Sequence, residues 1–283
     1  MVPVRGPRGV KNAQIRVSAA LKLSSPATRE FWEIPVLFED EHLLALDKPA
    51  GLLSSPDRYD PDRPNLMRLL HDGIAAGKPW ARERHLTYLS NAHRLDLQTS
   101  GVILLAKNKP ALVTLANLFG TEKPEKKYLA LVRGEPAETR FEVAVKLAPH
   151  PVKLGMMRAD FKGGKHAKTI FEVVENFPRF GYALLSCRPL TGRTHQIRVH
   201  ASHFSLPIVG DELYGGKPLW LSRLKSDYRL KPGREERPLL ARVALHAEQL
   251  QLNHPVTQEP VTIVAPLPKD FKVALKYLRQ YSV

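Results

Sequence analysis

Three segments carry polar side chains that could do chemistry where a sheet would not otherwise need them. The first is His93–Gly101, in which Asp96 is followed by turn-forming residues and then by an apolar run. A tight turn there would hold the Asp96 carboxylate at the edge of a sheet, and loops on a rigid scaffold commonly carry function. A simpler interpretation is that Asp96 caps the turn and pairs with Arg94. On these residues alone, we prefer the simpler interpretation.

The second segment, Thr191–His200, predicts a strand over 194–200. With a period of two, one face would carry His195, and the opposite face would carry a polar row with Arg198 in its middle. A polar row on a central strand is costly unless it lines a cleft or meets partners. The third segment, Lys126-Lys127-Tyr128, places a phenol at a strand start, where an edge tyrosine that packs its ring is the simpler interpretation.

Other chemistries fit the sequence less well. His195, His200 and His203 match no standard zinc spacing and have no acidic cluster beside them, so we expect no metal site. Cys187 is the single cysteine, so no disulfide can form within the chain, and its neighbours indicate a buried strand rather than a nucleophile. No apolar stretch is long enough for a membrane span.

The elements that must position these segments are mostly strands. Apolar runs at 36–38 and 43–46 predict a hairpin, and Gly101–Ala106 predicts a buried strand. Asn65 and Asn108 are candidate N-caps of two helices. Further strands are predicted at 128–132, 141–147, 168–175, 182–188, 245–251 and 261–264. Few of them alternate with helices, so we expect an α+β fold with a large mixed, mostly antiparallel sheet and a central cleft.

The charge balance points to a polyanionic partner. The 283 residues hold 43 Lys and Arg against 28 Asp and Glu, a net charge of +15. Such a field attracts nucleic acid, although basic composition alone also fits simple solubility. We expect residues 1–30 to form a flexible basic tail and 31–283 to form one domain, with 217–242 as a basic inserted loop. Its cations could contact phosphates and its aromatics could stack on bases, or it could be a solvated connector.

Taken together, the segments resemble the RluA-type (ribosomal large-subunit) pseudouridine synthases. The string His93-Arg94-Leu95-Asp96-x-x-Thr99-Ser100-Gly101 is similar to the catalytic signature of that family. Around it, further family-like strings follow in order: Asp47–Gly51, Lys126-x-Tyr128, Gly164-Lys165-x-Ala167-x-Thr169, Thr191–His200, Pro207–Gly215 and Leu245–Ala247. The resemblance covers roughly residues 36–278.

The resemblance implies an isomerase that converts uridine to pseudouridine in RNA without a metal, nucleotide or redox cofactor. It assigns Asp96 as the essential aspartate, Tyr128 as the active-site tyrosine and Arg198 as the basic partner of Asp96. It also implies that Arg94 helps hold the target nucleotide out of its helix. The remaining residues expected to bind substrate are His93, Thr99, Arg193, Thr194, His195 and Gln196.

The implied substrate is 23S or other large-subunit ribosomal RNA, with transfer RNA as the alternative. We expect a monomer in the cytoplasm, away from membranes. Many relatives also carry an N-terminal RNA-binding module, for which residues 1–35 are too short. Two other functions stay open: an inactive RNA-binding relative, and a hydrolase in which water accepts the ribose and uracil is released.

Overall fold

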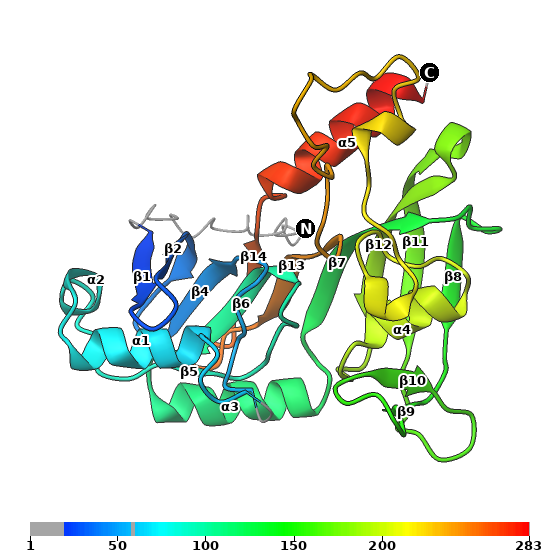
Figure 1. The fold of residues 1–283 in the computed structure, drawn as a ribbon. Coiled ribbons are helices and arrows are strands. Elements are labelled where there is room, and N and C mark those ends of the chain that lie inside the picture. The colour runs from blue at the N-terminus through cyan, green and yellow to red at the C-terminus, as the bar shows by residue number, and fades with distance from the viewer. Residues whose placement is uncertain (1–19, 58–59, 283) are drawn as a thin grey trace, which may run out of the picture.

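The computed structural model describes residues 20–57 and 60–282, and a ten-stranded sheet runs through them (Figure 1). Its main path follows the order β3-β4-β6-β13-β7-β12-β11-β8, while β14 pairs with β13 and β5 pairs with β6. The strands are β3 Val36–Glu39, β4 Leu43–Lys48, β5 Ser90–Asn91, β6 Ser100–Ala106, β7 Glu125–Arg133, β8 Arg140–Val143, β11 Thr169–Phe177, β12 Tyr182–Pro189, β13 Leu245–Asn253 and β14 Pro260–Val264.

The two halves of the sheet meet where β6 pairs with β13, and this is its single parallel pairing among the described strands. Gly101 lies at this seam with a positive φ of 112°, and a Cβ there would collide with the carbonyl of Ala247. Glycine is therefore required at this position, because both the backbone angle and the close approach exclude a side chain. The seam fixes the start of β6 directly after the Asp96 turn.

Helices cover both faces of the first half of the sheet. Leu44 and Leu46 pack in the same core cluster as α1 Leu66–Ala75, whereas Leu43 and Ala45 pack with α3 Lys109–Gly120. Adjacent strand residues point to opposite faces, so α1 and α3 lie on opposite sides of β4. Both helices begin at the predicted caps, because the side chains of Asn65 and Asn108 accept backbone N–H groups.

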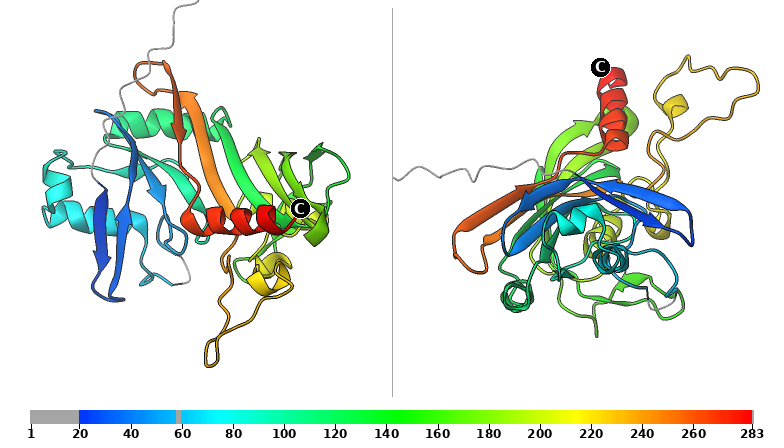
Figure 2. Two further views of the ribbon diagram at one scale, coloured as in Figure 1. Left: turned by 90° about the horizontal axis from the view of Figure 1, so that it is seen from above. Right: turned by 90° about the vertical axis from the view of Figure 1, so that its left-hand side faces the viewer.

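The second half of the sheet packs against α4 Gln196–His203 and α5 Lys269–Tyr281, which share a core with β7 and β12. Figure 2 shows α5 along one side of this half and the loop after α4 reaching away from the body. The smaller elements are β1 Leu21–Ser25, β2 Glu30–Ile34, β9 Leu147–Pro149, β10 Met157–Ala159, α2 Pro79–Arg82 and the 3₁₀ turns η1 Pro178–Phe180, η2 Glu212–Tyr214 and η3 Leu221–Arg223. No helix in the described part of the chain could cross a bilayer.

The α+β fold and its mixed, mostly antiparallel sheet are confirmed, but three local predictions differ from the structure. The strand predicted at 194–200 is wrong, since Gln196–His203 form α4. The strand predicted at 141–147 ends at Val143. Within the expected tail, residues 21–25 form β1, which pairs with β2; Leu21 and Leu23 are buried, which holds this strand on the core. Residues 1–19 of that tail lie outside the described residues.

In segment 217–242, which the sequence predicts as a basic inserted loop, η3 is the one helix or strand assigned. Its two ends are held together by two backbone hydrogen bonds: the N–H of Leu219 donates to the carbonyl of Leu240, and the N–H of Leu239 donates to the carbonyl of Leu219. Leu219 and Leu240 are both buried. Six cationic side chains on the loop are exposed: Lys217, Arg223, Arg229, Lys231, Arg234 and Arg237. Trp220 and Tyr228 are half-buried, so the aromatic rings are less open than the cations.

Candidate active site

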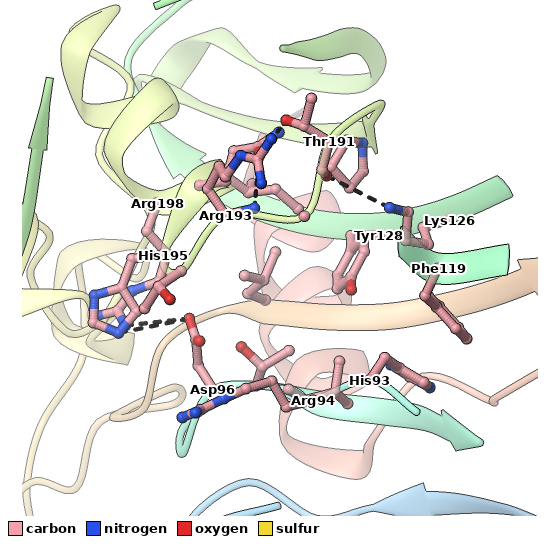
Figure 3. A pocket seen from close by; sticks show the side chains of 18 of the residues that line it. His93, Arg94, Asp96, Phe119, Lys126, Tyr128, Thr191, Arg193, His195 and Arg198 are labelled. Carbon is pink, nitrogen blue, oxygen red and sulfur yellow. Dashed lines mark hydrogen bonds and ion pairs between the residues drawn. The ribbon is translucent and has the colours of Figure 1, made fainter. Parts of the chain in front are cut away.

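A cavity of about 260 Å³ opens at the seam of the sheet, between the turn before β6 and the start of α4 (Figure 3). The turn before β6 forms one wall, which we call the Asp96 wall (residues 92–99). The opposite side is the α4 wall (residues 191–198). All ten residues predicted from the sequence line this cavity: His93, Arg94, Asp96, Thr99, Tyr128, Arg193, Thr194, His195, Gln196 and Arg198.

The Asp96 wall is held in place mainly through its own backbone. The N–H of Thr99 donates to the carbonyl of Asp96 at 3.1 Å, which closes the predicted turn. Ser54 bonds both the N–H and the carbonyl of Leu95, and the N–H of Gly51 donates to the carbonyl of Leu97 at 2.8 Å. The Asp96 carboxylate therefore stands on a fixed turn while 20% of its side chain stays exposed to the cavity.

Arg198 reaches Asp96 from the first turns of α4. Its Nη1 lies 3.4 Å from Asp96 Oδ2, so the predicted pairing is present. The stronger contact of Arg198 is with Asp211, whose two carboxylate oxygens accept from Nε at 2.7 Å and from Nη2 at 2.8 Å. Because Asp211 is only 1% exposed, this bidentate pair fixes the guanidinium plane and leaves Nη1 for Asp96.

His195 lies beside Arg198, because a helix replaces the predicted strand. It is the N-cap of α4 and adopts a left-handed backbone with φ of 54°. Its Nδ1 lies 2.8 Å from Tyr214 Oη, and its Nε2 lies 3.9 Å from Asp96 Oδ2. Burial lowers the pKa of His195, and the nearby Asp96 opposes that effect only in part.

Two of the side chains predicted to bind substrate, His93 and Gln196, instead make hydrogen bonds to other groups of the protein. The Nε2 of His93 accepts the N–H of Leu104 at 2.9 Å, and its ring stacks on Phe119 with centroids 4.6 Å apart. Burial lowers the pKa of His93 to about 4, which keeps that ring neutral. Gln196 bonds Thr191, Lys168, Thr169 and the N–H of Arg193. Both residues border the cavity, but their polar atoms hold its walls.

Among the other predicted residues, Thr194 is exposed and Thr99 is buried, while the guanidinium of Arg193 donates to the carbonyl of His166 and pairs with Glu122. Arg94 is exposed, and the ion-pair partner of Asp96 among the described residues is Arg198 rather than Arg94, with the Nε2 of His195 3.9 Å from the same carboxylate oxygen. Tyr128 lies on β7 across the cavity from Asp96 (Figure 3). Burial raises the pKa of Tyr128 well above its usual range, and the Asp96 charge adds to this, so its hydroxyl stays protonated.

The described residues contain no group of three or more His, Cys, Asp and Glu side chains placed to hold a metal ion. His200 instead bonds Thr169 and the carbonyl of Val145, inside the fold. Cys187 is fully buried, and burial raises the pKa of its thiol, so it is unsuited to act as a nucleophile.

Sequence reasoning assigned no role to three residues that shape this site. Asp211 and Tyr214 lie in the family-like string Pro207–Gly215, whose polar residues gave the available signal. Lys48 is fully buried below the Asp96 wall, where its Nζ donates to the carbonyls of Pro49 and Leu52. The sequence carried no sign of its burial beyond its place in the string Asp47–Gly51.

Comparison with known proteins finds relatives that are named as pseudouridine synthases. Two proteins named ribosomal large subunit pseudouridine synthase D, from Xanthomonas campestris and Xylella fastidiosa, are 36% and 38% identical to the chain. The first alignment covers 97% of this chain and 78% of the relative, and the second covers 88% and 70%. The Escherichia coli K12 protein named dual-specificity RNA pseudouridine synthase RluA is 31% identical over 84% of this chain and 94% of its own length.

A solved structure shows the same fold. The human RNA Pseudouridylate Synthase Domain Containing 4 superposes with a TM-score of 0.62 at 25% identity, covering 86% of this chain and 92% of that one. The sequence model described as RNA pseudouridylate synthase matches residues 42–203, which include both cavity walls. The chain therefore belongs to the RNA pseudouridylate synthase family.

Proposed function

We propose that this isomerase converts uridine to pseudouridine in large-subunit ribosomal RNA, with Asp96 as its catalytic residue. The observation that carries the proposal is the Asp96 carboxylate on a fixed turn, 3.4 Å from the Nη1 of Arg198, in a cavity of about 260 Å³. The names of the relatives from Xanthomonas campestris and Xylella fastidiosa support ribosomal RNA as the substrate class.

The reaction breaks the bond between N1 of uracil and the ribose, turns the base, and joins C5 to the same sugar carbon. Breaking a glycosidic bond develops positive charge on that carbon, which a nearby carboxylate stabilises or attacks. Asp96 is the carboxylate that faces the cavity with exposed oxygen atoms. Joining the base through C5 releases the C5 proton, and the freed N1 takes up a proton, so the net change is an isomerisation that needs no external electron donor or acceptor.

Arg198 and Tyr128 have supporting roles in this proposal. Arg198 directs its Nη1 to Asp96 while Asp211 holds the rest of the guanidinium, so the carboxylate has a fixed cationic neighbour. Tyr128 can stack its ring on the uracil and donate a hydrogen bond. It is unsuited to accept a proton as phenolate, because burial raises its pKa so far above the ordinary value.

Recognition of RNA is assigned to the rim and the basic loop. A uridine in folded RNA must leave its stack to reach the cavity, and an intruding side chain can take its place. Arg94 suits that role because it is exposed at the mouth of the Asp96 wall. The six exposed cations of loop 217–242 can contact phosphates on either side of the target.

The direct test uses RNA that carries tritium at C5 of uridine. Isomerisation releases that tritium to water, so we expect the wild-type chain to release it and the Asp96→Asn variant to release at least about 1,000-fold less. RNA affinity should stay within about twofold of wild type, because Asn has the same shape. Turnover like the wild type in Asp96→Asn would remove the proposed mechanism.

Product analysis separates the alternatives. A hydrolase would leave free uracil and an abasic ribose, whereas an inactive RNA-binding relative would leave uridine unchanged. Mapping of pseudouridines in all cellular RNAs, with and without this gene, identifies the substrate. We expect a position in large-subunit ribosomal RNA to lose its modification, and loss confined to transfer RNA would overturn the substrate assignment.

We also propose that the enzyme acts as a monomer in the cytoplasm. One chain supplies every residue that lines the described cavity, so a second copy is not needed to complete it. The single thiol, Cys187, is buried and unpaired, as suits a reducing compartment. Light scattering at working concentration tests the oligomeric state, and cell fractionation tests the compartment; a dimer or a membrane-bound pool would contradict these statements.

A further inference from the structure

Tyr214 stands directly behind the cavity wall and holds His195 from the side opposite Asp96. It comes from η2, is 8% exposed, and packs its ring 4.9 Å from the guanidinium carbon of Arg198. Its hydroxyl has two neighbours, the backbone N–H of Met157 at 2.9 Å and the Nδ1 of His195 at 2.8 Å. Tyr214 therefore does not face the substrate space but touches a residue that does.

The hydrogen-bond directions follow from the chemistry of these neighbours. The backbone N–H of Met157 can only donate, so the phenolic oxygen accepts it. The phenolic proton then has His195 Nδ1 as its acceptor, and within the described residues the hydroxyl has no other hydrogen-bond partner. A neutral imidazole has one acceptor nitrogen and one N–H, so an accepting Nδ1 requires the proton to be on Nε2.

The electrostatics agree with that assignment. Burial raises the pKa of Tyr214 to about 12, so its hydroxyl keeps the proton that it donates. Burial also lowers the pKa of His195, which favours the neutral ring with a single N–H. A doubly protonated ring would instead place a second N–H against a hydroxyl whose oxygen already accepts Met157.

The backbone of His195 gives an independent sign that this ring position is enforced. Its φ of 54° lies in the left-handed region, which costs a residue other than glycine about 1 kcal/mol or more. Nε2 then faces the cavity 3.9 Å from Asp96 Oδ2, too far for a hydrogen bond, and has no other polar partner within the described residues. The fold thus presents an unsatisfied N–H beside the carboxylate.

We propose that Tyr214 is a positioning residue that locks His195 in its Nε2–H form, so that His195 donates a hydrogen bond to an oxygen atom of the uridine bound beside Asp96. The identity of that ligand rests on the proposed function, whereas the locked form of the free imidazole does not. Tyr214→Phe removes the hydroxyl alone and keeps the ring on Arg198.

The first experiment observes the ring without any turnover. In the ¹⁵N spectrum of imidazole-labelled, RNA-free enzyme at neutral pH, His195 should show a protonated Nε2 and a bare Nδ1. In Tyr214→Phe the two nitrogens should shift toward each other as both neutral forms become populated. A protonated Nδ1 in the wild type, or an unchanged spectrum in Tyr214→Phe, would overturn the proposal even if the enzyme proves active on RNA.

The second experiment measures kcat and KM for tritium release in a double-mutant cycle. Tyr214→Phe should lower kcat about tenfold, the effect of one lost hydrogen bond to the reacting substrate, with KM within about twofold. In the His195→Ala background the same change should have no further effect. An equal loss in both backgrounds would show that Tyr214 acts through the fold and not through His195.

Two further variants keep this test decisive. His195→Gln places an amide N–H near the position of Nε2 without any need for the tyrosine, so it should retain more activity than His195→Ala and be insensitive to Tyr214→Phe. Tyr182→Phe removes the hydroxyl of a partly buried tyrosine at the start of β12 and should leave kcat unchanged. If no RNA is turned over by the wild type, the proposed function fails while the spectrum still decides the role of Tyr214.

Discussion

The two walls of the cavity are built in different ways. On the Asp96 wall, most of the bonds that hold the turn end on its backbone: the carbonyl of Asp96 accepts from Thr99, Ser54 bonds the backbone of Leu95, and Asn91 donates to the carbonyl of His93. On the α4 wall, side chains hold one another, as in the Arg198–Asp211 pair and in the bonds of Gln196. The first wall places a reactive group, and the second orients the groups around it.

This difference implies different responses to mutation. A turn held by its backbone keeps its shape when a side chain changes, so a substitution at Asp96 should act on chemistry alone. A wall of buried side-chain bonds loses both shape and stability when one member is removed, because its partner is left without a hydrogen bond. Substitutions on the α4 wall should therefore lower the free energy of unfolding together with turnover.

Arg198→Ala gives the largest effect expected on the α4 wall. It leaves the carboxylate of Asp211, which is 1% exposed, without its cationic partner, so the free energy of unfolding should fall by about 3–5 kcal/mol. Turnover should fall at least about 100-fold, because Asp96 loses its cationic neighbour. Chemical denaturation and tritium release measure the two effects.

The double variant Arg198→Met/Asp211→Leu is the matched control for that prediction. It removes both charges and fills their space, so it should recover most of the lost stability and none of the lost activity. If Arg198→Ala proved as stable as the wild type, the described difference between the walls would be wrong.

Gln196→Leu should have an intermediate effect. Its amide bonds Thr191, Lys168 and Thr169 and accepts the N–H of Arg193, so its loss leaves buried polar groups unpaired. We expect the free energy of unfolding to fall by about 1–3 kcal/mol. Gln98→Leu makes the same chemical change beside Asp96, where the turn is held by backbone, and should cost less than about 0.5 kcal/mol. Equal losses in thermal or chemical denaturation would contradict the comparison.

The same difference explains how much the sequence predicted. The Asp96 wall depends on local rules, namely turn-forming residues before an apolar run, so its turn and the strand after it were predicted correctly. The segment Thr191–His200 consists mostly of polar residues, several of which make hydrogen bonds inside the fold. It therefore has no row of apolar residues at helical spacing. Its hydrophobic pattern therefore did not distinguish a helix from a strand, and tertiary contacts decide the outcome.

The wrong strand prediction for that segment did not change which residues line the cavity, but it changed how they are arranged around Asp96. A strand would place His195 on the face opposite Arg198, whereas α4 brings both toward Asp96. The bidentate role of Asp211 could not be predicted, because it depends on how η2 lies against α4. The burial of Lys48 could likewise not be predicted from the sequence, because lysine side chains are ordinarily exposed.

The basic loop that follows the α4 wall should affect RNA binding alone. Changing Arg229, Lys231 and Arg234 together to Ala should lower RNA affinity and reduce the slope of log affinity against log salt by up to about 2, because fewer phosphate contacts release fewer counterions. The control is the triple variant Lys269→Ala, Lys272→Ala and Lys276→Ala, which makes the same charge change on exposed positions of α5. Equal slopes for the two variants would remove the loop from the RNA contact surface.

The pH dependence of stability depends on Lys48, the buried lysine behind the Asp96 wall. Burial lowers its folded-state pKa from 10.5 to about 7, and the charges of Asp96 and Asp47 oppose this only in part. Between about pH 7 and pH 10.5 the unfolded chain binds a proton that the folded chain has released. Raising the pH through that window removes an advantage of the unfolded state, so the Lys48 contribution to the free energy of unfolding should rise by about 1 kcal/mol per pH unit.

Lys48→Met keeps the length of the side chain and removes this titration. We expect chemical denaturation at pH 7, 8 and 9 to show a flatter pH dependence for Lys48→Met than for the wild type, and an unchanged dependence for Lys272→Met on the surface of α5. A wild-type slope in Lys48→Met would mean that the lysine is charged throughout and that the carbonyls of Pro49 and Leu52 fully replace its lost water. In that case the Asp96 wall, like the α4 wall, would depend on a buried charge for its shape.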